Sequence, residues 1–188
     1  MSKQTDVRPV AVSVYFLPIE SRVPLKFGPE VTTEVTCARV KMTVEDRQGK
    51  RASGWGETPL SVQWVWPSQL SYEERHQALR SLTLEIARAW LRSSALPGHP
   101  MEVGHRFLAE VLPGLTDEFN RTNLKGREGV PHLAALVCTS AFDLALHDAF
   151  GVLHDVATYE TYNEKYMTYS LDDYLKPAEG SDVSFEDR

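Results

Sequence analysis

The sequence has little basic character for its length. Its 188 residues include 20 Lys or Arg and 26 Asp or Glu, which gives a formal net charge of −6 at pH 7. Proteins that bind nucleic acid or anionic lipid concentrate positive charge on the binding surface. We therefore expect neither a nucleic-acid partner nor a membrane-surface role.

Cysteines and long apolar runs are also scarce. The two cysteines, Cys37 and Cys138, are far apart and lack C-x-x-C spacing, so we expect reduced, partly buried thiols rather than a disulfide or a metal pair. No apolar run approaches the roughly 20 residues that span a membrane. The first residues lack the apolar core of a secretory signal. These absences predict a cytoplasmic protein without a membrane segment.

What remains is an ordinary globular composition. Hydrophobic residues make up 42% of the chain and charged residues 24%, which argues against a disordered, fibrous or disulfide-scaffold protein. A chain of this length can bury a core, and it corresponds to one domain or to one domain with a fragment of another.

The first part of the chain alternates as strands do. Every second residue is apolar over 9–17 and again over 38–44, the period-two pattern of a strand with one buried face. The turn-like residues 46–49 then lead into a glycine-rich third strand over 52–57. We expect an antiparallel meander. The predicted inward-facing residues are Val10, Val12, Val14, Phe16, Ala38, Val40, Met42 and Val44.

Helical spacing follows. Ser71 and Glu74 match a capping box at the start of a long helix, in which each side chain satisfies a backbone amide of the other. Its apolar stripe consists of Leu79, Leu82, Ile86 and Trp90. Residues 96–100 break this helix, and a shorter one is expected to end at the Pro113-Gly114 pair.

Residues 115–129 are polar and are predicted to form a loop. Pro131 opens a third helix that we expect to end just before Gly151. Regular patterns weaken beyond that glycine, and the small, acidic tail 180–188 is expected to be poorly ordered. The predicted fold class is α+β: a three-stranded antiparallel β-meander followed by a three- to four-helix bundle.

The third helical segment resembles a known family. The run from Ala141 to Gly151, Ala-Phe-Asp-Leu-Ala-Leu-His-Asp-Ala-Phe-Gly, is similar to the third helix of the N-terminal capping domain in the mandelate racemase and muconate lactonizing enzyme branch of the enolase superfamily. Asp143, Asp148 and Gly151 fall in the motif positions, and His147 stands where many members carry tryptophan. The resemblance implies an enolase N-terminal domain-like capping domain over 1–151, with 152–188 a partly disordered linker into the start of a truncated barrel.

The family resemblance also implies a chemistry and its location. Such enzymes are Mg²⁺-dependent racemases, epimerases, dehydratases or cycloisomerases that remove the proton α to a carboxylate. Their acid, base and metal ligands belong to a (β/α) barrel of about 200 residues or more, and far fewer residues follow Gly151. The resemblance thus implies no catalytic or metal-binding residue in this chain, which would be inactive alone. Its implied partners are the missing barrel, a small carboxylate substrate and, in a homo-oligomer, further copies of the same chain.

Two segments match the loops with which the family covers its substrate. In the first, residues 22–30, Arg22 or Lys26 could pair with a substrate carboxylate and Phe27 could exclude water. The alternative is a solvated hairpin connection. In the second, residues 54–58, the glycines beside Trp55 would let the backbone approach a ligand closely; the alternative is a packed edge tryptophan. The second-loop candidates are Trp55, Glu57 and Thr58.

Two rival functions stay open. A free-standing α+β interaction module could use the same loops, or Trp64 and Trp66, which we expect on one side of an extended segment. A small metal-dependent enzyme has weaker support, because Asp143 and Asp148 point in different directions on a helix. The histidines also lack the H-x-x-x-H or H-x-H spacing of a zinc site; they are His99, His105, His132 and His154.

Overall fold

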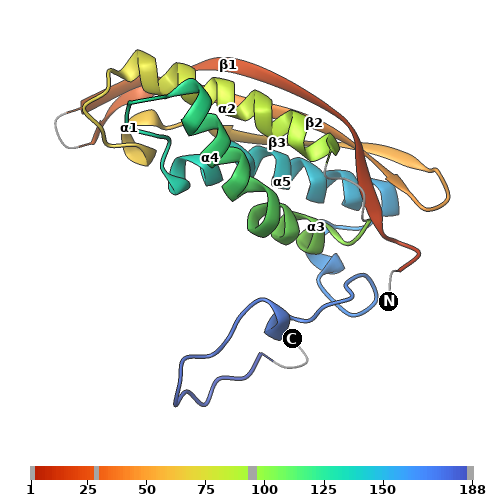
Figure 1. Cartoon of the computed structure of the whole chain (residues 1–188). Coiled ribbons are helices and arrows are strands. Elements are labelled where there is room, and N and C mark those ends of the chain that lie inside the picture. The colour runs from red at the N-terminus through yellow and green to blue at the C-terminus, as the bar shows by residue number, and fades with distance from the viewer. Residues whose placement is uncertain (1–2, 28–29, 93–96, 186–188) are drawn as a thin grey trace.

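The computed structural model describes residues 3–27, 30–92, 97–185, and these form one antiparallel sheet with helices packed on it (Figure 1). The sheet order is β1-β2-β3. β1 spans Val7–Phe27, β2 spans Glu30–Asp46 and β3 spans Arg51–Pro59. Helices follow the strands, so the predicted α+β class and the predicted meander are confirmed.

The alternation read from the sequence matches the buried face of the sheet. On the central strand β2, Val40, Met42 and Val44 are fully buried, and Val14 of β1 packs against the same core. The turn after β2 also forms as expected. Gly49 takes a φ of 81°, and the Asp46 carboxylate accepts the Gln48 and Lys50 amides at 2.8 and 2.9 Å.

The first predicted loop is wrong as a loop. Residues 22–27 continue β1, and β2 begins at Glu30, with Leu25 opposite Thr32 and Lys26 opposite Val31. The proline and glycine of this segment suggested a connection. However, β1 is an edge strand, and an edge strand tolerates proline because half of its amides need no partner in the sheet. The ladder register shifts between Glu20 and Leu25, around Pro24.

Two long helices cover the inner face of the sheet. α2, Tyr72–Arg92, begins at the predicted capping box: the Ser71 amide donates to Glu74 at 3.0 Å, and the Glu74 amide donates to the Ser71 hydroxyl at 3.3 Å. Its predicted apolar stripe is buried. The second long helix is α5, His132–His154, which packs along β3. The short helix α1, Val62–Val65, connects β3 to α2 in the chain.

The predicted helix end at Pro113 is wrong. α3, Pro100–Arg106, runs through a π-helical turn, η1, Phe107–Val111, into α4, Leu112–Asn123. Pro113 falls in the first turn of α4, where a missing amide and a fixed φ cost little. Much of the predicted loop 115–129 is therefore helix. Most of its polar residues are exposed, whereas Phe119 is buried, and the buried Thr116 hydroxyl donates to the Leu112 carbonyl at 2.8 Å.

α5 is longer than the sequence predicted. It passes through Gly151 and ends at His154, where Asp155 takes the left-handed conformation with a φ of 54°. Two 3-10 turns follow, η2 at Thr158–Thr161 and η3 at Leu171–Asp173, in a segment that extends away from the helices (Figure 1). By length and composition, α5 is the one helix in the described part of the chain that could span a membrane; 56% of its most apolar window is buried in the fold.

Candidate functional site

The β1–β2 hairpin forms a two-stranded arm beyond the end of β3. Ladder pairing between β2 and β3 stops at Cys37 and Pro59, so residues 18–27 and 30–36 form a ladder only with each other. At the base of this ribbon, Thr36 is held by the Leu60 amide, which donates to its carbonyl at 2.9 Å, and by the His76 ring, 2.8 Å from its hydroxyl. We call these residues the arm. Its exposed side chains include Val23, Leu25 and Val31, which are 64%, 49% and 56% exposed. An exposed ribbon edge with apolar side chains is a surface that proteins normally cover.

The predicted residues of the first loop lie on this arm. Arg22 and Lys26 are both exposed, and Arg22 lies in the irregular stretch between Glu20 and Leu25. Phe27 closes β1, but its side chain lies outside the described part of the structure. Two cationic side chains on an exposed arm could reach an anionic group on a neighbouring surface.

The second predicted loop is strand. Trp55, Glu57 and Thr58 all belong to β3. Trp55 is 48% exposed on the outer face of the sheet, with its ring centroid 6.1 Å from that of Tyr15 and 5.6 Å from the Lys41 ammonium. This contact places a cation beside an aromatic ring.

Glu57 shares the outer face with Trp55, and Thr58 does not. The Arg39 guanidinium donates to the Glu57 carboxylate at 2.6 Å, and both line a shallow hollow of about 370 Å³ beside Trp55. Thr58 points the other way, as successive strand residues do, and its hydroxyl lies 2.7 Å from that of Ser140 on α5. Thr58 therefore joins the strand to the helix.

The glycines around Trp55 make room for α5 rather than for a ligand. A β-carbon on Gly54 would stand 2.1 Å from the Ala149 nitrogen, and one on Gly56 would stand 2.1 Å from the Ala141 carbonyl oxygen. Helix backbone thus occupies the space beside both glycines, so the expectation that they let a ligand approach the strand is wrong. The small residues of α5 that line this contact are Ala141, Ala145 and Ala149.

Asp148 of the family-like motif has a structural partner. Its carboxylate accepts the Trp55 amide at 2.8 Å. β3 is an edge strand, so this amide would otherwise lack a partner in the sheet. The motif residues therefore have structural roles in this fold. The alanines let α5 approach β3, and Asp148 accepts a hydrogen bond from the exposed edge of β3.

The two predicted segments do not converge on one pocket. Lys26 pairs with Val31 and Trp55 with Lys41, a separation of about ten residues along β2, or roughly 33 Å. The end of β3 and α1, however, lie at the same end of the molecule as the arm (Figure 1). The arm and α1 therefore lie at one end of the molecule.

Trp64 and Trp66 do not form one surface. Trp64 is 55% exposed, whereas Trp66 is buried with its indole nitrogen 3.2 Å from the Glu128 carboxylate. The expected extended segment is instead the helical turn α1, which ends at Val65, and Trp66 follows it with a φ of −142° and a ψ of 72°. Trp64 alone remains available to a partner.

A buried histidine cluster was not predicted. His99 is fully buried, with Nε2 3.0 Å from the Thr161 hydroxyl and Nδ1 accepting the Met101 amide at 3.2 Å. Burial lowers its pKa to about 3, with help from the nearby His147 and His154. His147 Nδ1 lies 2.9 Å from the Tyr162 hydroxyl. These contacts fasten residues 158–166 to α3 and α5.

The carboxylates and histidines do not gather as metal ligands. In the part of the chain that the structure describes, no three His, Cys, Asp or Glu side chains are placed to hold a metal ion. Asp143 lies 3.9 Å from His147, and burial raises the pKa of Asp143 and lowers that of His147. The magnesium implied by the resemblance therefore has no ligand set among these residues.

Comparison with known proteins gives structural similarities only. No family model and no curated protein matches this sequence. Among solved structures, a Bradyrhizobium enolase complexed with magnesium and mandelic acid is 16% identical with a TM-score of 0.47, over 84% of this chain and 35% of that one. The L-Ala-D/L-Glu epimerase from Bacillus subtilis is 13% identical with a TM-score of 0.49, over 83% and 34%.

A member of the enolase superfamily from Roseovarius nubinhibens is 16% identical with a TM-score of 0.42, over 79% of this chain and 31% of that one. This chain spans about a third of the length of the structures it matches. At these identities and TM-scores the matches transfer no activity, ligand or residue role.

Proposed function

We propose that this chain is the substrate-capping and specificity domain of a Mg²⁺-dependent enolase-superfamily enzyme. The parent enzyme would be a racemase, epimerase, dehydratase or cycloisomerase that removes the proton α to a carboxylate. In this proposal residues 1–151 form the cap, 152–188 lead into the barrel, and the acid, base and magnesium ligands belong to the barrel.

The arm carries this proposal. Its apolar side chains Val23, Leu25 and Val31 are exposed beside the cations Arg22 and Lys26. An apolar, cationic arm is suited to lie over the mouth of a second domain, where it would exclude water and pair with a substrate carboxylate. Trp55 and Glu57, on the outer face of β3, remain candidates for a second contact with that domain. Thr58, on the opposite face, would hold β3 in place through its bond to Ser140 of α5.

The motif of α5 gives the proposal a second basis. Asp148 and the alanines that face Gly54 and Gly56 fix α5 against β3. The family-like residues thus fix α5 against the sheet from which the arm extends. We further propose that the protein is cytoplasmic, consistent with two free buried thiols, and that the parent enzyme is a homo-oligomer.

An exchange experiment tests where the chemistry lies. The purified chain is incubated in D₂O with Mg²⁺ and a panel of α-hydroxy, α-amino and sugar acids, and loss of the α-proton signal is followed by NMR. We expect exchange at the buffer rate, because no metal-ligand set exists among the described residues. Exchange above that rate would show that the chain carries its own chemistry.

A free-standing interaction module is the second candidate. The exposed Trp64 and the Tyr15–Trp55 pair on the outer sheet face favour it, since exposed aromatic side chains are enriched at protein interfaces. The two candidates differ in the coding sequence. A cap requires a barrel in the same reading frame, whereas a module does not.

A further inference from the structure

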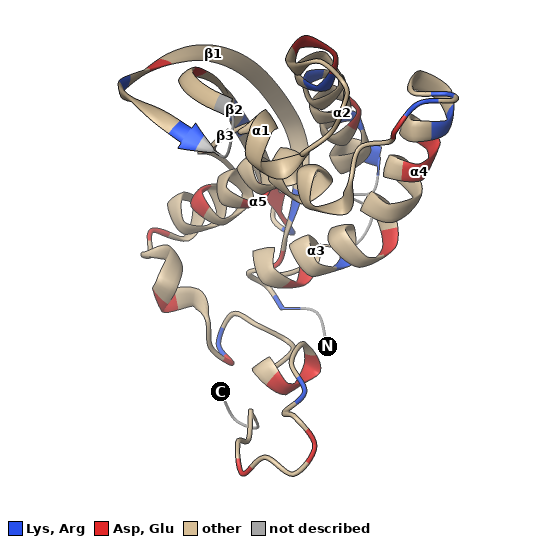
Figure 2. Cartoon of the chain, turned by 90° about the vertical axis from the view of Figure 1, so that its left-hand side faces the viewer, with Lys and Arg blue, Asp and Glu red and all other residues tan. Residues whose placement is uncertain are grey.

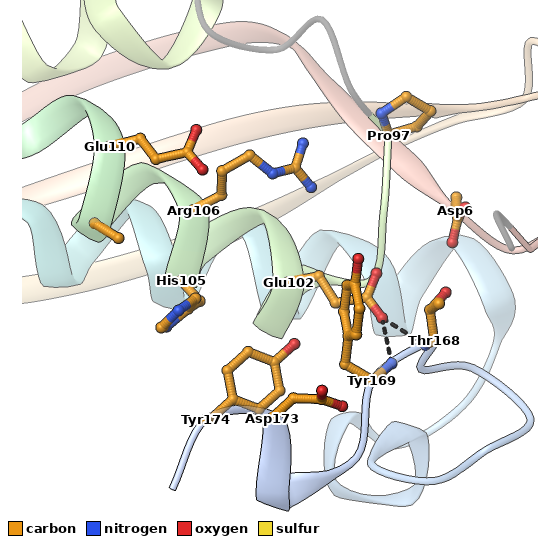
Figure 3. Close-up of a pocket in the computed structure, with 11 residues that line it drawn as sticks. Asp6, Pro97, Glu102, His105, Arg106, Glu110, Thr168, Tyr169, Asp173 and Tyr174 are labelled. Atoms are coloured by element: carbon orange, nitrogen blue, oxygen red, sulfur yellow. Dashed lines mark hydrogen bonds between the residues drawn. The ribbon is translucent and has the colours of Figure 1, made fainter.

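A cavity separate from the arm lies between α3 and the C-terminal segment (Figure 3). Its volume is about 530 Å³, and its walls come from the residue before β1, from α3 and η1, and from residues 168–174. A cavity of this size can enclose a small organic molecule. The histidine cluster positions the C-terminal wall, because Thr161 and Tyr162 are bonded to His99 and His147.

Carboxylates dominate the charge of this cavity. Asp6, Glu102, Glu110 and Asp173 line it, against a single guanidinium, that of Arg106. Figure 2 shows acidic positions both on α3 and on the C-terminal segment below it. Such a lining favours a cationic ligand over an anionic one.

Two buried polar atoms in the cavity wall have no hydrogen-bond partner. Asp6 is 2% exposed; its Oδ2 accepts the Lys3 amide at 2.7 Å and lies 3.8 Å from the Arg47 guanidinium, but its Oδ1 accepts nothing. The buried Tyr174 hydroxyl is also unpaired. In Figure 3 the Asp6 carboxylate is directed toward Thr168, and the Tyr174 hydroxyl is directed toward Glu102. A buried acceptor without a donor is costly, so a ligand that brings N–H groups would be stabilised there.

Aromatic rings form the remaining wall. The Tyr174 ring packs edge-on against His105 at 4.9 Å and against Tyr169 at 6.5 Å between centroids. Glu102 holds this wall in place by accepting the Thr168 and Tyr169 amides. Aromatic rings beside carboxylates give the alkyl part of an amine an apolar surface to pack against.

We propose that this cavity binds a small organic molecule through a protonated primary amine. The ammonium lies beside Asp6, Glu102 and the Tyr174 hydroxyl, and the alkyl part packs against the Tyr169 and Tyr174 rings. A metal ion is a poorer match, because the described residues contain no three-ligand metal group. The proposal is independent of the capping function.

NMR titration of the full chain tests this site. n-Butylammonium is the probe, n-butanol is its neutral counterpart, and tetramethylammonium is a cation without N–H donors. We expect n-butylammonium to shift the Thr168, Tyr169 and Tyr174 amide signals saturably and the other two compounds to leave them unchanged. Equal shifts with n-butanol or tetramethylammonium, or no saturable shift, would overturn the proposal.

Variants locate the ammonium. Asp6→Asn should weaken binding by about tenfold or more, because the ammonium loses its buried counter-charge, and Tyr174→Phe should weaken it by a few-fold. Glu118→Gln, the same charge change on the exposed side of α4, should leave binding unchanged. If Asp6→Asn fails to give a folded spectrum, Tyr174→Phe decides. Unchanged binding in the folded cavity variants, or equal weakening by Glu118→Gln, would contradict the assignment.

Discussion

Gly56 of β3 lies so close to Ala141 of α5 that a β-carbon on the glycine would stand 2.1 Å from the Ala141 carbonyl oxygen. Real β-carbons do not approach backbone oxygen this closely, so a side chain at this position must push α5 away from the sheet. The contact sets the distance between β3 and α5, the helix that carries the family-like motif.

Gly56→Ala should therefore destabilise the chain. We expect a loss of about 1–3 kcal/mol or more in the free energy of unfolding, because the helix backbone cannot give way as a flexible side chain can. Urea unfolding followed by circular dichroism measures it. Gly114→Ala is the matched control: its β-carbon meets nothing within 4 Å, and in a helix alanine should be neutral or stabilising by up to about 1 kcal/mol. Equal effects at both positions would refute the close contact.

Asp148→Ala should expose the edge of β3. The Trp55 amide loses its acceptor at 2.8 Å, which we expect to cost about 1 kcal/mol and to accelerate exchange of that amide. Hydrogen–deuterium exchange read by NMR reports the Trp55 amide directly. Asp117→Ala, an exposed carboxylate on α4, should leave it unchanged. Unaltered Trp55 exchange in Asp148→Ala would mean that the amide is protected by something else.

The strands and the main helices could be read from the sequence because each buries one face. Val40, Met42 and Val44 alternate on β2, and the Ser71–Glu74 box begins α2, as predicted. The errors occur at two prolines, which usually end a helix or strand but are accommodated here by the surrounding structure. Pro113 is accommodated in the turn after η1, and Pro24 lies in an edge strand.

The site was less predictable because its contacts join distant parts of the chain. Gly54 and Gly56 look the same in sequence whether a ligand or a helix lies against them, and only the packing of α5 decides. His99 and Thr161 meet through the tertiary fold, so no local pattern could have linked them. Nor could spacing show that Glu57 and Thr58 face opposite sides of β3 until the strand itself was established.

His99 should make stability fall as the pH is lowered. Its pKa in the fold is lowered to about 3 from an ordinary value near 6.5, so between these values the unfolded chain binds a proton that the folded chain does not. Stability from the neutral, buried ring is thus complete above about pH 6.5 and is lost as the pH falls toward about 3, with a slope approaching 1.4 kcal/mol per pH unit.

His99→Asn should flatten this dependence, because asparagine does not titrate. Urea unfolding at a series of pH values compares the variant with the parent chain and with His132→Asn, which changes an exposed histidine at the start of α5. A pH dependence in His99→Asn as steep as in the parent chain would contradict the buried neutral histidine.

Neither cysteine should react while the chain is folded. Cys138 is fully buried, and burial raises the pKa of its thiol to about 12; burial and the Glu57 charge raise that of Cys37. Thiolate is the reactive form, so a disulfide-exchange reagent should label both residues rapidly in urea and slowly in buffer. Rapid labelling of Cys138 in the native chain would show that α5 opens easily from the core.

Sequencing the full transcript that encodes this chain decides whether it is a capping domain, because a cap needs its barrel. We predict that the reading frame continues beyond Arg188 for about 200 residues or more, with acidic residues at the ends of successive predicted strands. A stop codon directly after Arg188 would contradict the capping role and leave the exposed arm to another partner.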